Sequence, residues 1–564
     1  MKPFFSLTLL LTSAAALAQQ PVPIPDTLAG SSINLTLRAD SVQFFPGRKT
    51  RTLGYNGQSY FGPTLILRKG QTANMMVTNL ISDSTTVHWH GLHVAAVNDG
   101  GPHTFIPPGQ MWMPRFPVMN DAALYWYHPH LHKRTAEQAM RGAAGFIIVR
   151  SADEAALNLP RRYGVDDVPL AVQSHQFDPL NQINYRGMQD SILLVNGARN
   201  PYLALPAQVV RLRLLNASQE RNFNFGFTGN RSFYVIANDG GLLAAPVPTT
   251  RILLSSGERA EILLDLSGLN GQTLHLMSYG SELPMGVQGG PVMMMPGAPP
   301  MDSPLNAANF NVLQLNVGAP TANPVTTIPT SLLPVVPWPA ATATTTRTIR
   351  FTAANPLAMD GPFFFNGQLF DMGRIDYTIP ENSTEIWQLQ NQTMVAHPFH
   401  LHGMSFYLLD RNGVSVPPKE RGAKDVVLVA PNETVRFITR FEHFPDLTVP
   451  YMYHCHILMH EDDGMMGQYV IAATPTGLPD AAPVGDVRAV PNPATGTFRL
   501  EGTWATPPSA LELRDLLGRV VLRQPVTHGA PVVEAAALPA GVYHCALYDA
   551  AGRRTATTKV VLTR

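Results

Sequence analysis

Cysteine, charge and long hydrophobic runs are all scarce in this chain of 564 residues. The two cysteines, Cys455 and Cys545, cannot supply the disulfide framework on which small secreted domains depend. Charged residues make up 14% of the chain and give a formal net charge of zero, so we expect no nucleic-acid partner and no attraction to anionic membranes. After residue 18 no stretch approaches the roughly 20 apolar residues of a membrane-spanning helix.

The first 18 residues predict a signal peptide. Lys2 supplies a positive start, residues 4–11 form a short apolar run, and Ala16 and Ala18 give the small-residue pattern of a cleavage site. The apolar run is too short to span a bilayer. We therefore predict an exported, soluble protein.

Proline and glycine are abundant and separate short strand-like segments. The chain has 50 prolines and 44 glycines, and turn residues of this kind bound apolar, β-branched runs. Such runs lie at residues 64–67, 146–149, 209–215, 262–266, 426–429 and 435–439. Short strands joined by turns are typical of Greek-key sandwiches, so we predict an all-β fold.

The densest chemical signal is His454-Cys455-His456, followed by His460 and Met465. A cysteine, a histidine and a methionine from one loop form a blue-copper ligand set once a second histidine is supplied. Successive side chains on a strand point to opposite faces, so Cys455 faces one metal while His454 and His456 face another. The pattern predicts a short covalent connection between two metal sites.

Three further histidine clusters supply ligands for the second site. They are His88-Trp89-His90, His128-Pro129-His130, and His400-Leu401-His402 preceded by His397. Alternate spacing places both imidazoles of each pair on one strand face. Together with the pair around the cysteine they provide eight imidazoles, enough for three metal ions, and His397 is the natural second histidine for the cysteine site.

Zinc is the alternative metal. Structural zinc prefers closed tetrahedral sites rich in cysteine, and one cysteine cannot build several of those. Imidazole suits copper, while a thiolate and a thioether select a separate, softer copper site. We therefore predict copper.

From about Leu53 to Ile471 the chain resembles the multicopper oxidases, with all four copper motifs in the family's order. The resemblance implies four copper ions. It implies a type 1 ion held by His397, Cys455, His460 and axial Met465, a type 2 ion held by His88 and His400, and a type 3 pair held by His90, His128, His130, His402, His454 and His456. It leaves out His93 and His132, which lie close to these motifs.

The resemblance also implies three cupredoxin-like Greek-key β-sandwich domains. We place them at residues 20–160, 161–320 and 345–475, with a linker at 321–344. Since the middle domain contains only His175 and His275, neither in a pair, we expect the cluster between the first and third domains and a spacer role for the second.

Residues 485–564 resemble the C-terminal sorting domain of the type IX secretion system of Bacteroidota. The motifs are Pro491-Asn492-Pro493, residues 513–519, and Leu538-Pro539-Ala540-Gly541. We expect a small β-sandwich there; the alternative is an ordinary C-terminal β-domain, such as one that binds carbohydrate. The resemblance implies the type IX machinery as a partner and, after transit through the periplasm, a secreted or outer-membrane-surface product.

The expected reaction is the one-electron oxidation of a small reducing substrate, coupled to reduction of O2 to water by a monomeric enzyme. Protons must reach the cluster, so a nearby carboxylate is required. Asp99 and Glu461 lie beside predicted ligands, and the family places proton-relay acids at both positions. The alternatives are a turn aspartate and a solvated acid.

The sequence favours a laccase-like oxidase of phenols and aromatic amines. Cuprous oxidases of this family carry a methionine-rich insert in the region that corresponds to residues 353–365. In this chain that region contains a single methionine, Met359. Thr393 and Val395 stand where an acid and a methionine are expected. Cuprous oxidase, bilirubin oxidase and an exported copper-buffering protein stay as alternatives.

A second sulfur cluster bears on the cuprous alternative. It comprises Met285, Met293, Met294, Met295 and Met301. Thioethers select Cu(I), so the cluster could recruit cuprous ions. It could also be an adaptable apolar loop, which we favour.

The sorting interpretation of the tail predicts that it is removed on secretion. Peptide mass spectrometry of the protein recovered outside the cell should find no peptides beyond residue 485. Secreted protein that retains those peptides would contradict the interpretation.

Overall fold

The computed structural model describes residues 19–473, except 188, 292–302 and 356–358, and residues 487–564, except 505, 517, 528, 529, 551 and 553. The predicted signal peptide and the methionines at 293–295 and 301 lie outside these residues. The chain divides after Ala473 into two compact units. Both consist almost entirely of strands, which confirms the predicted all-β class.

The first sandwich pairs a five-stranded sheet with a second sheet. The strands of the five-stranded sheet, in spatial order, are β1 (Thr27–Ala29), β4 (Thr64–Arg68), β10 (Gly145–Arg150), β9 (Leu124–His128) and β6 (His88–His90). The second contains β3 (Thr50–Tyr55), β2 (Ser32–Val42), β5 (Thr72–Asn79) and β7 (Met111–Trp112), and β8 (Arg115–Pro117) pairs with β5. Ile33, Leu35 and Leu37 of β2 are buried in alternation, as expected for a strand with one face on the core.

The middle sandwich has sheets of seven and five strands. The seven are β13 (Ala198–Arg199), β12 (Ile192–Val195), β11 (Asp167–His175), β15 (Val209–Asn216), β20 (Arg259–Asp265), β17 (Phe233–Asn238) and β18 (Gly241–Thr249). The five are β14 (Tyr202–Pro206), β22 (Asn309–Gly318), β21 (Thr273–Tyr279), β16 (Phe223–Phe227) and β19 (Ile252–Leu254). β15 is buried along its whole length, and its Arg211 and Arg213 share Glu261 of the neighbouring β20, while Arg211 also pairs with Glu154 and Arg213 with Asp167.

The third sandwich supplies the cysteine motif. Its six-stranded sheet runs β24 (Phe363–Phe365), β23 (Thr345–Ala353), β26 (Thr384–Asn391), β31 (Thr434–Arg440), β28 (Phe406–Arg411) and β29 (Val414–Ser415). Its five-stranded sheet runs β25 (Tyr377–Pro380), β33 (Met466–Ala472), β32 (Asp446–Cys455), β27 (His397–Leu401) and β30 (Val426–Val429). Asn412 and Gly413 join β28 to β29 with φ of 50° and 78°, the left-handed conformation that a tight hairpin turn requires.

Short helices lie between strands of these sandwiches. They are α1 (Ala96–Asp99), α2 (Thr135–Met140), α3 (Ala152–Ala156), α4 (Leu458–Asp462) and the 3-10 turns η1 (Thr228–Asn230), η2 (Gly280–Glu282), η3 (Ala340–Thr342) and η4 (Pro418–Glu420). Asp462 of α4 accepts hydrogen bonds from the backbone N–H groups of Thr135 and Ala136, both at 3.0 Å, and so joins α4 to the start of α2. No helix among the described residues has the length and apolar character needed to cross a membrane.

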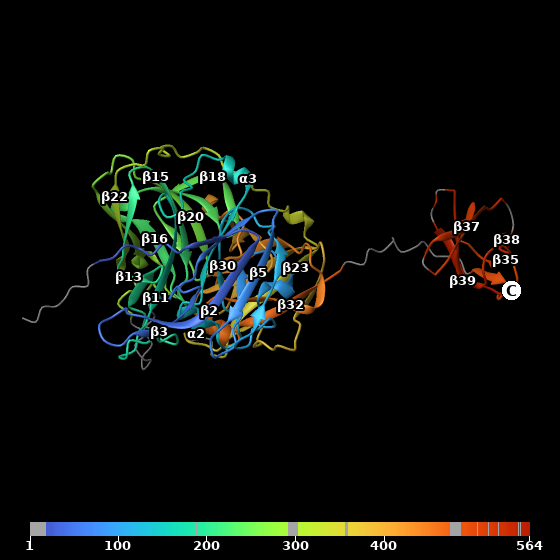
Figure 1. The fold of residues 1–564 in the computed structure, drawn as a ribbon, viewed down its shortest axis with the longest axis horizontal. Coiled ribbons are helices and arrows are strands. Elements are labelled where there is room, and N and C mark those ends of the chain that lie inside the picture. The colour runs from blue at the N-terminus through green and yellow to red at the C-terminus, as the bar shows by residue number, and fades with distance from the viewer. Residues whose placement is uncertain are drawn as a thin grey trace, which may run out of the picture. The chain divides into compact units, whose positions relative to one another are not determined.

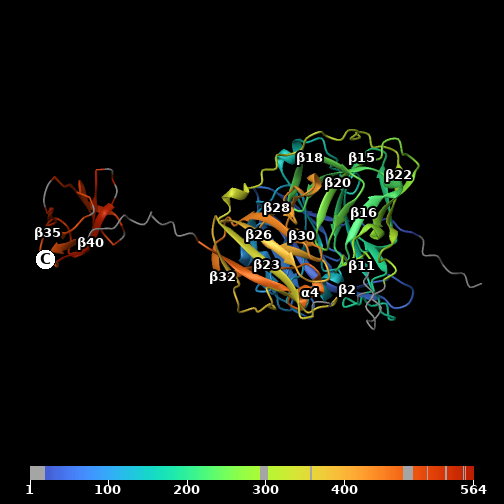
Figure 2. The ribbon, with the colours of Figure 1, turned by 180° about the vertical axis from the view of Figure 1, so that it is seen from behind.

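The views in Figures 1 and 2 show how the sandwiches of the first unit are arranged. Green strands of the middle sandwich gather on one side, and the blue first and orange third sandwiches share the other. The predicted strand runs all fall within strands, except that Leu266 lies just beyond β20. The predicted domain boundaries stay predictions.

The second unit is a small β-sandwich, as predicted. One sheet contains β34 (Val487–Val490), β35 (Thr497–Gly502) and β38 (Val532–Glu534). The other contains β37 (Val520–Pro525), β36 (Ala510–Arg514), β39 (Gly541–Tyr548) and β40 (Arg554–Leu562). Cys545 is buried in its core, so this cysteine has a packing environment rather than a reactive one.

Candidate metal centre

Two pairs of strands align the predicted ligands. In the first sandwich β6 pairs with β9, which places His88 opposite His128. In the third, β27 pairs with β32, which places His400 opposite His454 and Phe399 opposite Cys455. Within the predicted ligand set, His460 is partly exposed and all other members are buried.

The cysteine site is compact and dry. The Cys455 Sγ lies 3.5 Å from His397 Nδ1 and 3.6 Å from His460 Nδ1. His397 donates its other ring N–H to Thr393 Oγ1 at 2.9 Å, which leaves Nδ1 with its lone pair toward the sulfur. Burial lowers the pKa of His460 to about 3, so both imidazoles are neutral ligands. Met465 is buried in the same hydrophobic cluster as Cys455.

Three imidazoles from two sandwiches converge at one point. The Nε2 atom of His454 lies 3.1 Å from Nε2 of His130 and 3.1 Å from Nε2 of His402. His454 donates its Nδ1–H to the Cys455 carbonyl at 2.9 Å, and His402 donates its own to Asp99 Oδ2 at 2.7 Å. Their facing Nε2 atoms therefore both carry lone pairs. Two lone pairs at this distance repel each other unless a cation lies between them. Two nitrogen ligands that each lie about 2.0–2.1 Å from one metal ion are separated by roughly this Nε2–Nε2 distance.

A second group of imidazoles also has facing nitrogens with lone pairs. His90 donates from Nε2 to Asp425 Oδ1 at 3.0 Å, and His128 donates from Nδ1 to the Pro129 carbonyl at 2.8 Å. The remaining nitrogens, His90 Nδ1 and His128 Nε2, face each other at 3.2 Å with lone pairs on both. The ring of His456 lies 5.0 Å from that of His90, and its Nε2 is buried without a hydrogen-bond partner in the described structure.

The last two histidines of the set are held by backbone carbonyls. His88 donates its Nδ1–H to the Asp99 carbonyl at 3.0 Å, and His400 donates its own to the Asp425 carbonyl at 2.8 Å. Both Nε2 atoms are buried and have no hydrogen-bond partner among the described residues. Buried polar atoms left this way are costly, whereas a metal ion would satisfy them.

The eight imidazoles form overlapping clusters: His130 groups with His402 and His454, while His88 groups both with His90 and His128 and with His400 and His402. Burial lowers the pKa of His130, His402 and His456 well below the usual range, and the neighbouring imidazoles lower it further. Neutral, oriented imidazoles with unshared lone pairs are ligands for a transition metal such as copper.

Both predicted proton-relay acids lie against this cluster. Besides its bond to His402, Asp99 has its Oδ1 buried without a hydrogen-bond partner in the described structure. Glu461 accepts a hydrogen bond from Thr135 Oγ1 at 2.6 Å, and its carboxylate oxygens lie 3.3 Å from Nδ1 of His130 and of His454. Burial raises the pKa of Glu461 well above its usual range. The alternative of a solvated acid is wrong for Glu461, because the residue is only 1% exposed.

Sequence reasoning missed a buried contribution from the middle sandwich. Arg259 of β20 donates to both carboxylate oxygens of Asp425, each at 2.6 Å, and Asp425 is the acceptor of His90. Ser256 donates to the Ser218 carbonyl at 2.5 Å and so accepts from His456 Nδ1 at 3.2 Å, which leaves His456 Nε2 unprotonated. The prediction that the middle domain serves only as a spacer is therefore wrong.

Glycine at position 257 permits this close approach. A Cβ atom there would lie 2.8 Å from the His456 ring, and the residue has a φ of +83°. No motif surrounds Ser256, Arg259 or Asp425, so only their spatial placement identifies them. His93, left out of the ligand set, contacts the Gly403 carbonyl, and His132 packs against Phe370.

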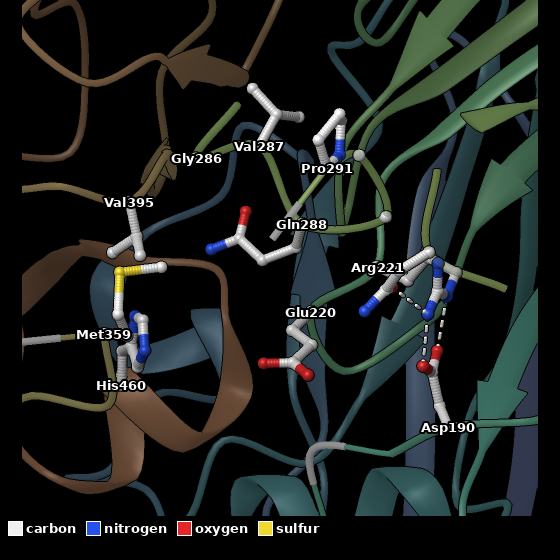
Figure 3. A pocket seen from close by; sticks show the side chains of 13 residues that line it. Asp190, Glu220, Arg221, Gly286, Val287, Gln288, Pro291, Met359, Val395 and His460 are labelled. Atoms are coloured by element: carbon white, nitrogen blue, oxygen red, sulfur yellow. Dashed lines mark hydrogen bonds and ion pairs between the residues drawn. The ribbon is translucent and has the colours of Figure 1, made fainter. Parts of the chain in front are cut away.

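His460 lines a pocket between the middle and third sandwiches (Figure 3). Glu220, Arg221 and residues 286–291 of the middle sandwich line it on one side. Met359, Val395 and His460 of the third sandwich line it on the other. A molecule in this pocket would contact the one predicted ligand that is partly exposed.

The chain matches known proteins across the region that holds this centre. Three models of one family, each described as multicopper oxidase, match residues 36–154, 126–278 and 336–475. A multicopper oxidase of Staphylococcus haemolyticus is 34% identical over 447 residues, which cover 77% of this chain and 88% of that relative. The cell division protein FtsP of Escherichia coli is 31% identical over 481 residues, which cover 82% and 95%.

A solved structure matches the fold as well. It is that of a laccase-like multicopper oxidase, CueO, from the lignin-degrading bacterium Ochrobactrum sp., described as active toward lignin model compounds and lignosulfonate. It is 32% identical, has a TM-score of 0.71 and covers 80% of this chain and 100% of its own.

Replacing Asp425 with asparagine should weaken metal binding at the histidine cluster. The change keeps the shape but removes the charge that orients His90 and neutralises Arg259, and losses of such ligand-orienting groups weaken affinity about 10- to 100-fold. Copper per chain after dialysis against a chelator should fall, while the blue absorption of the Cys455 site persists. Asp410→Asn, which affects a pair with the half-exposed Arg436, is the control. Equal copper contents in both variants would contradict the positioning role.

Proposed function

The chain belongs to the multicopper oxidase family, and we propose that it is a laccase-like member that couples one-electron oxidation of phenols and aromatic amines to the reduction of O2 to water. The observation that carries this proposal is the covalent connection at Cys455. Its sulfur lies in one ligand group, while its chain neighbour His454 lies in another, against His130 and His402.

Copper is the metal that the family implies and that the donor set fits. We propose four ions. His397, Cys455, His460 and Met465 would hold the first, His88 and His400 the second, and the two three-histidine groups the other two. Bound copper would accept single electrons at the cysteine site and reduce O2 at the histidine cluster.

The protein's own groups connect and supply the two sites. Electrons that enter at the partly exposed His460 have a short route from the Cys455 side chain through the backbone to His454 and His456. The carbonyl of Cys455 also accepts the Nδ1–H of His454 at 2.9 Å, which adds a hydrogen-bonded branch to that route. Asp99 contacts His402, Glu461 contacts His130 and His454, and both acids would deliver protons to the cluster.

Phenolic substrates are favoured by the surroundings of the cysteine site. Thr393 orients His397, and Val395 lines the pocket. A dedicated Cu(I) site would have an acid and a methionine at these two positions. Met359 is the one sulfur among the described residues lining that pocket. The activity reported for the Ochrobactrum protein is consistent with this substrate class.

A copper-buffering protein is the non-enzymatic alternative. Relatives named for cell division show that membership of this sequence group does not by itself establish oxidase activity. Buffering needs affinity but no connection between sites, and the His-Cys-His bridge argues against it. We also propose that the protein is exported through the type IX system and acts outside the cell as a monomer.

Oxygen uptake by the copper-loaded full-length chain tests the function. A bulky phenol should be turned over faster than bilirubin or Cu(I), with four phenols oxidised per O2 and no release of O2 on adding catalase. A blue protein that phenol reduces but air does not reoxidise would establish the buffering alternative. Cu(I) turnover far above phenol turnover, abolished by leucine at Met293, Met294 and Met295, would establish a cuprous oxidase.

The relay roles predict a specific defect in two variants. Asp99→Asn and Glu461→Gln remove proton carriers, so steady-state O2 uptake should fall about 100-fold, the low end of a lost acid–base group. Anaerobic bleaching of the blue absorption by a phenol should keep its rate, because that step needs no proton at the cluster. Asp410→Asn is the control. Full O2 turnover in both relay variants at unchanged copper content would rule the roles out.

A further inference from the structure

Three methionines lie together on the outer face of the first sandwich. Met76 belongs to β5, which is labelled in Figure 1, Met111 begins the edge strand β7, and Met113 directly follows β7. Met111 and Met113 are 48% and 70% exposed, and Met76 is partly exposed. Apolar side chains scattered singly over a surface are ordinary, but a group of one kind calls for an explanation.

Trp112 fixes the direction in which these side chains point. It lies between Met111 and Met113 and packs against the hydrophobic core of the first sandwich, and its partner Val77 in β5 is buried. Successive side chains along a strand point to opposite faces. The neighbours of this inward pair, Met111 and Met113 on one side and Met76 on the other, therefore point outward.

The strand register brings the methionine side chains close together. β5 pairs with β7 and β8 in one unbroken antiparallel register, which places Met76 directly opposite Met113. The adjacent pair is hydrogen-bonded, since Met75 donates its N–H to the Pro114 carbonyl at 2.9 Å. Met76 and Met113 therefore form a non-hydrogen-bonded pair, in which the Cα atoms are about 4.5 Å apart and the side chains lie closest. Met111 is the diagonal neighbour of Met76, at about 7–8 Å.

We propose that Met76, Met111 and Met113 form a binding site for a Cu(I) ion. Soft thioether sulfurs select Cu(I), whereas Ca²⁺ and Mg²⁺ take oxygen ligands. A methionine side chain has three rotatable bonds, so sulfurs at this spacing converge on one ion without movement of the strands. None of the three residues belongs to the four proposed copper sites, so the ion held here is an additional one.

The position of this site suits the capture of copper rather than the oxidation of a substrate. The pocket beside His460 is lined, among the described residues, by the middle and third sandwiches alone. A Cu(I) ion on the first sandwich therefore leaves that pocket free for the reductant. The site concentrates the metal that the chain itself needs, whichever reductant the enzyme uses.

The surroundings disfavour other occupants of this face. A partner protein could add a strand beside β7, but Pro114 has no N–H to offer it, and proline on an edge strand blocks such pairing. Arg115 is exposed on the same face, opposite Asn74. Its charge repels a divalent cation more strongly than a monovalent one. A soft, singly charged ion is therefore the favoured occupant.

Cu(I) titration of the full-length, copper-loaded chain tests the site. The protein is first fully reduced under argon, so that its bound copper cannot oxidise the added ion, and Cu(I) is supplied as its coloured complex with bicinchoninate. We expect the unaltered chain to withdraw one Cu(I) ion more than a Met111→Leu/Met113→Leu variant, and Met76→Leu to hold that ion more weakly. Leucine is a well-tolerated replacement of similar volume that removes the sulfur.

Met372→Leu is the matched control, because Met372 is an exposed methionine outside this group. This variant should withdraw as much Cu(I) as the unaltered chain. The comparison between variants also cancels any Cu(I) that the other methionines bind, including those at 293–295.

A second readout uses the unaltered chain. Ag(I) is a soft ion that the enzyme cannot oxidise, and it should shift the methyl resonances of isotope-labelled Met76, Met111 and Met113, each assigned through its leucine variant. Equal Cu(I) withdrawal by the double variant and the unaltered chain, or methyl resonances that do not move with Ag(I), overturns the inference and leaves the proposed function standing. Self-association that Met113→Lys abolishes, with no Cu(I) withdrawn, makes this face a protein interface and also overturns it.

Discussion

The crowding of neutral imidazoles at a dry interface is the constraint on which the rest of the structure depends. The Nε2 atom of His454 lies 3.1 Å from those of His130 and His402, and the anchored rings of His402 and His454 present lone pairs to each other. Without positive charge between them these nitrogens repel one another, and water has little access to a cluster whose members are fully buried. Metal ions and this packing are therefore mutually dependent: the ions relieve the repulsion, and the packing fixes their ligands before they bind.

The three sandwiches all contribute to this arrangement, although only two supply predicted ligands. The Arg259–Asp425–His90 chain passes from the middle sandwich through the third to the first, and all three residues are buried. Removing Arg259 or Asp425 would leave the buried charge of the other without this partner, which costs several kcal/mol. Through these contacts, the orientation of the predicted ligand His90 depends on the correct docking of the three sandwiches.

The geometry of β32 separates the two ligand groups to which the proposed function assigns electron entry and oxygen reduction. Alternation along the strand sends Cys455 to the group that includes the partly exposed His460 and sends its neighbours into the closed cluster. The pocket on the His460 side lies between the middle and third sandwiches. Under the proposed function, the reductant and O2 would therefore react at different places, connected by one residue.

The sequence by itself determined the features that depend on the spacing of residues close together in the chain. The period of two along strands was sufficient to predict which histidines act together and that Cys455 faces away from its neighbours. Turn residues around short β-branched runs were sufficient for the all-β class. These features depend on local backbone geometry, which the sequence encodes directly.

Tertiary structure alone decided what depends on residues distant in the chain. Nothing around Asp425, Arg259 or Ser256 marks them as partners of His90 and His456, because single polar residues acquire such roles only when separate sandwiches dock. The same holds for Glu220, whose neighbours in the sequence give no sign that it faces His460. Burial and long-range contact set the orientation of these groups, and neither is a property of a local sequence pattern.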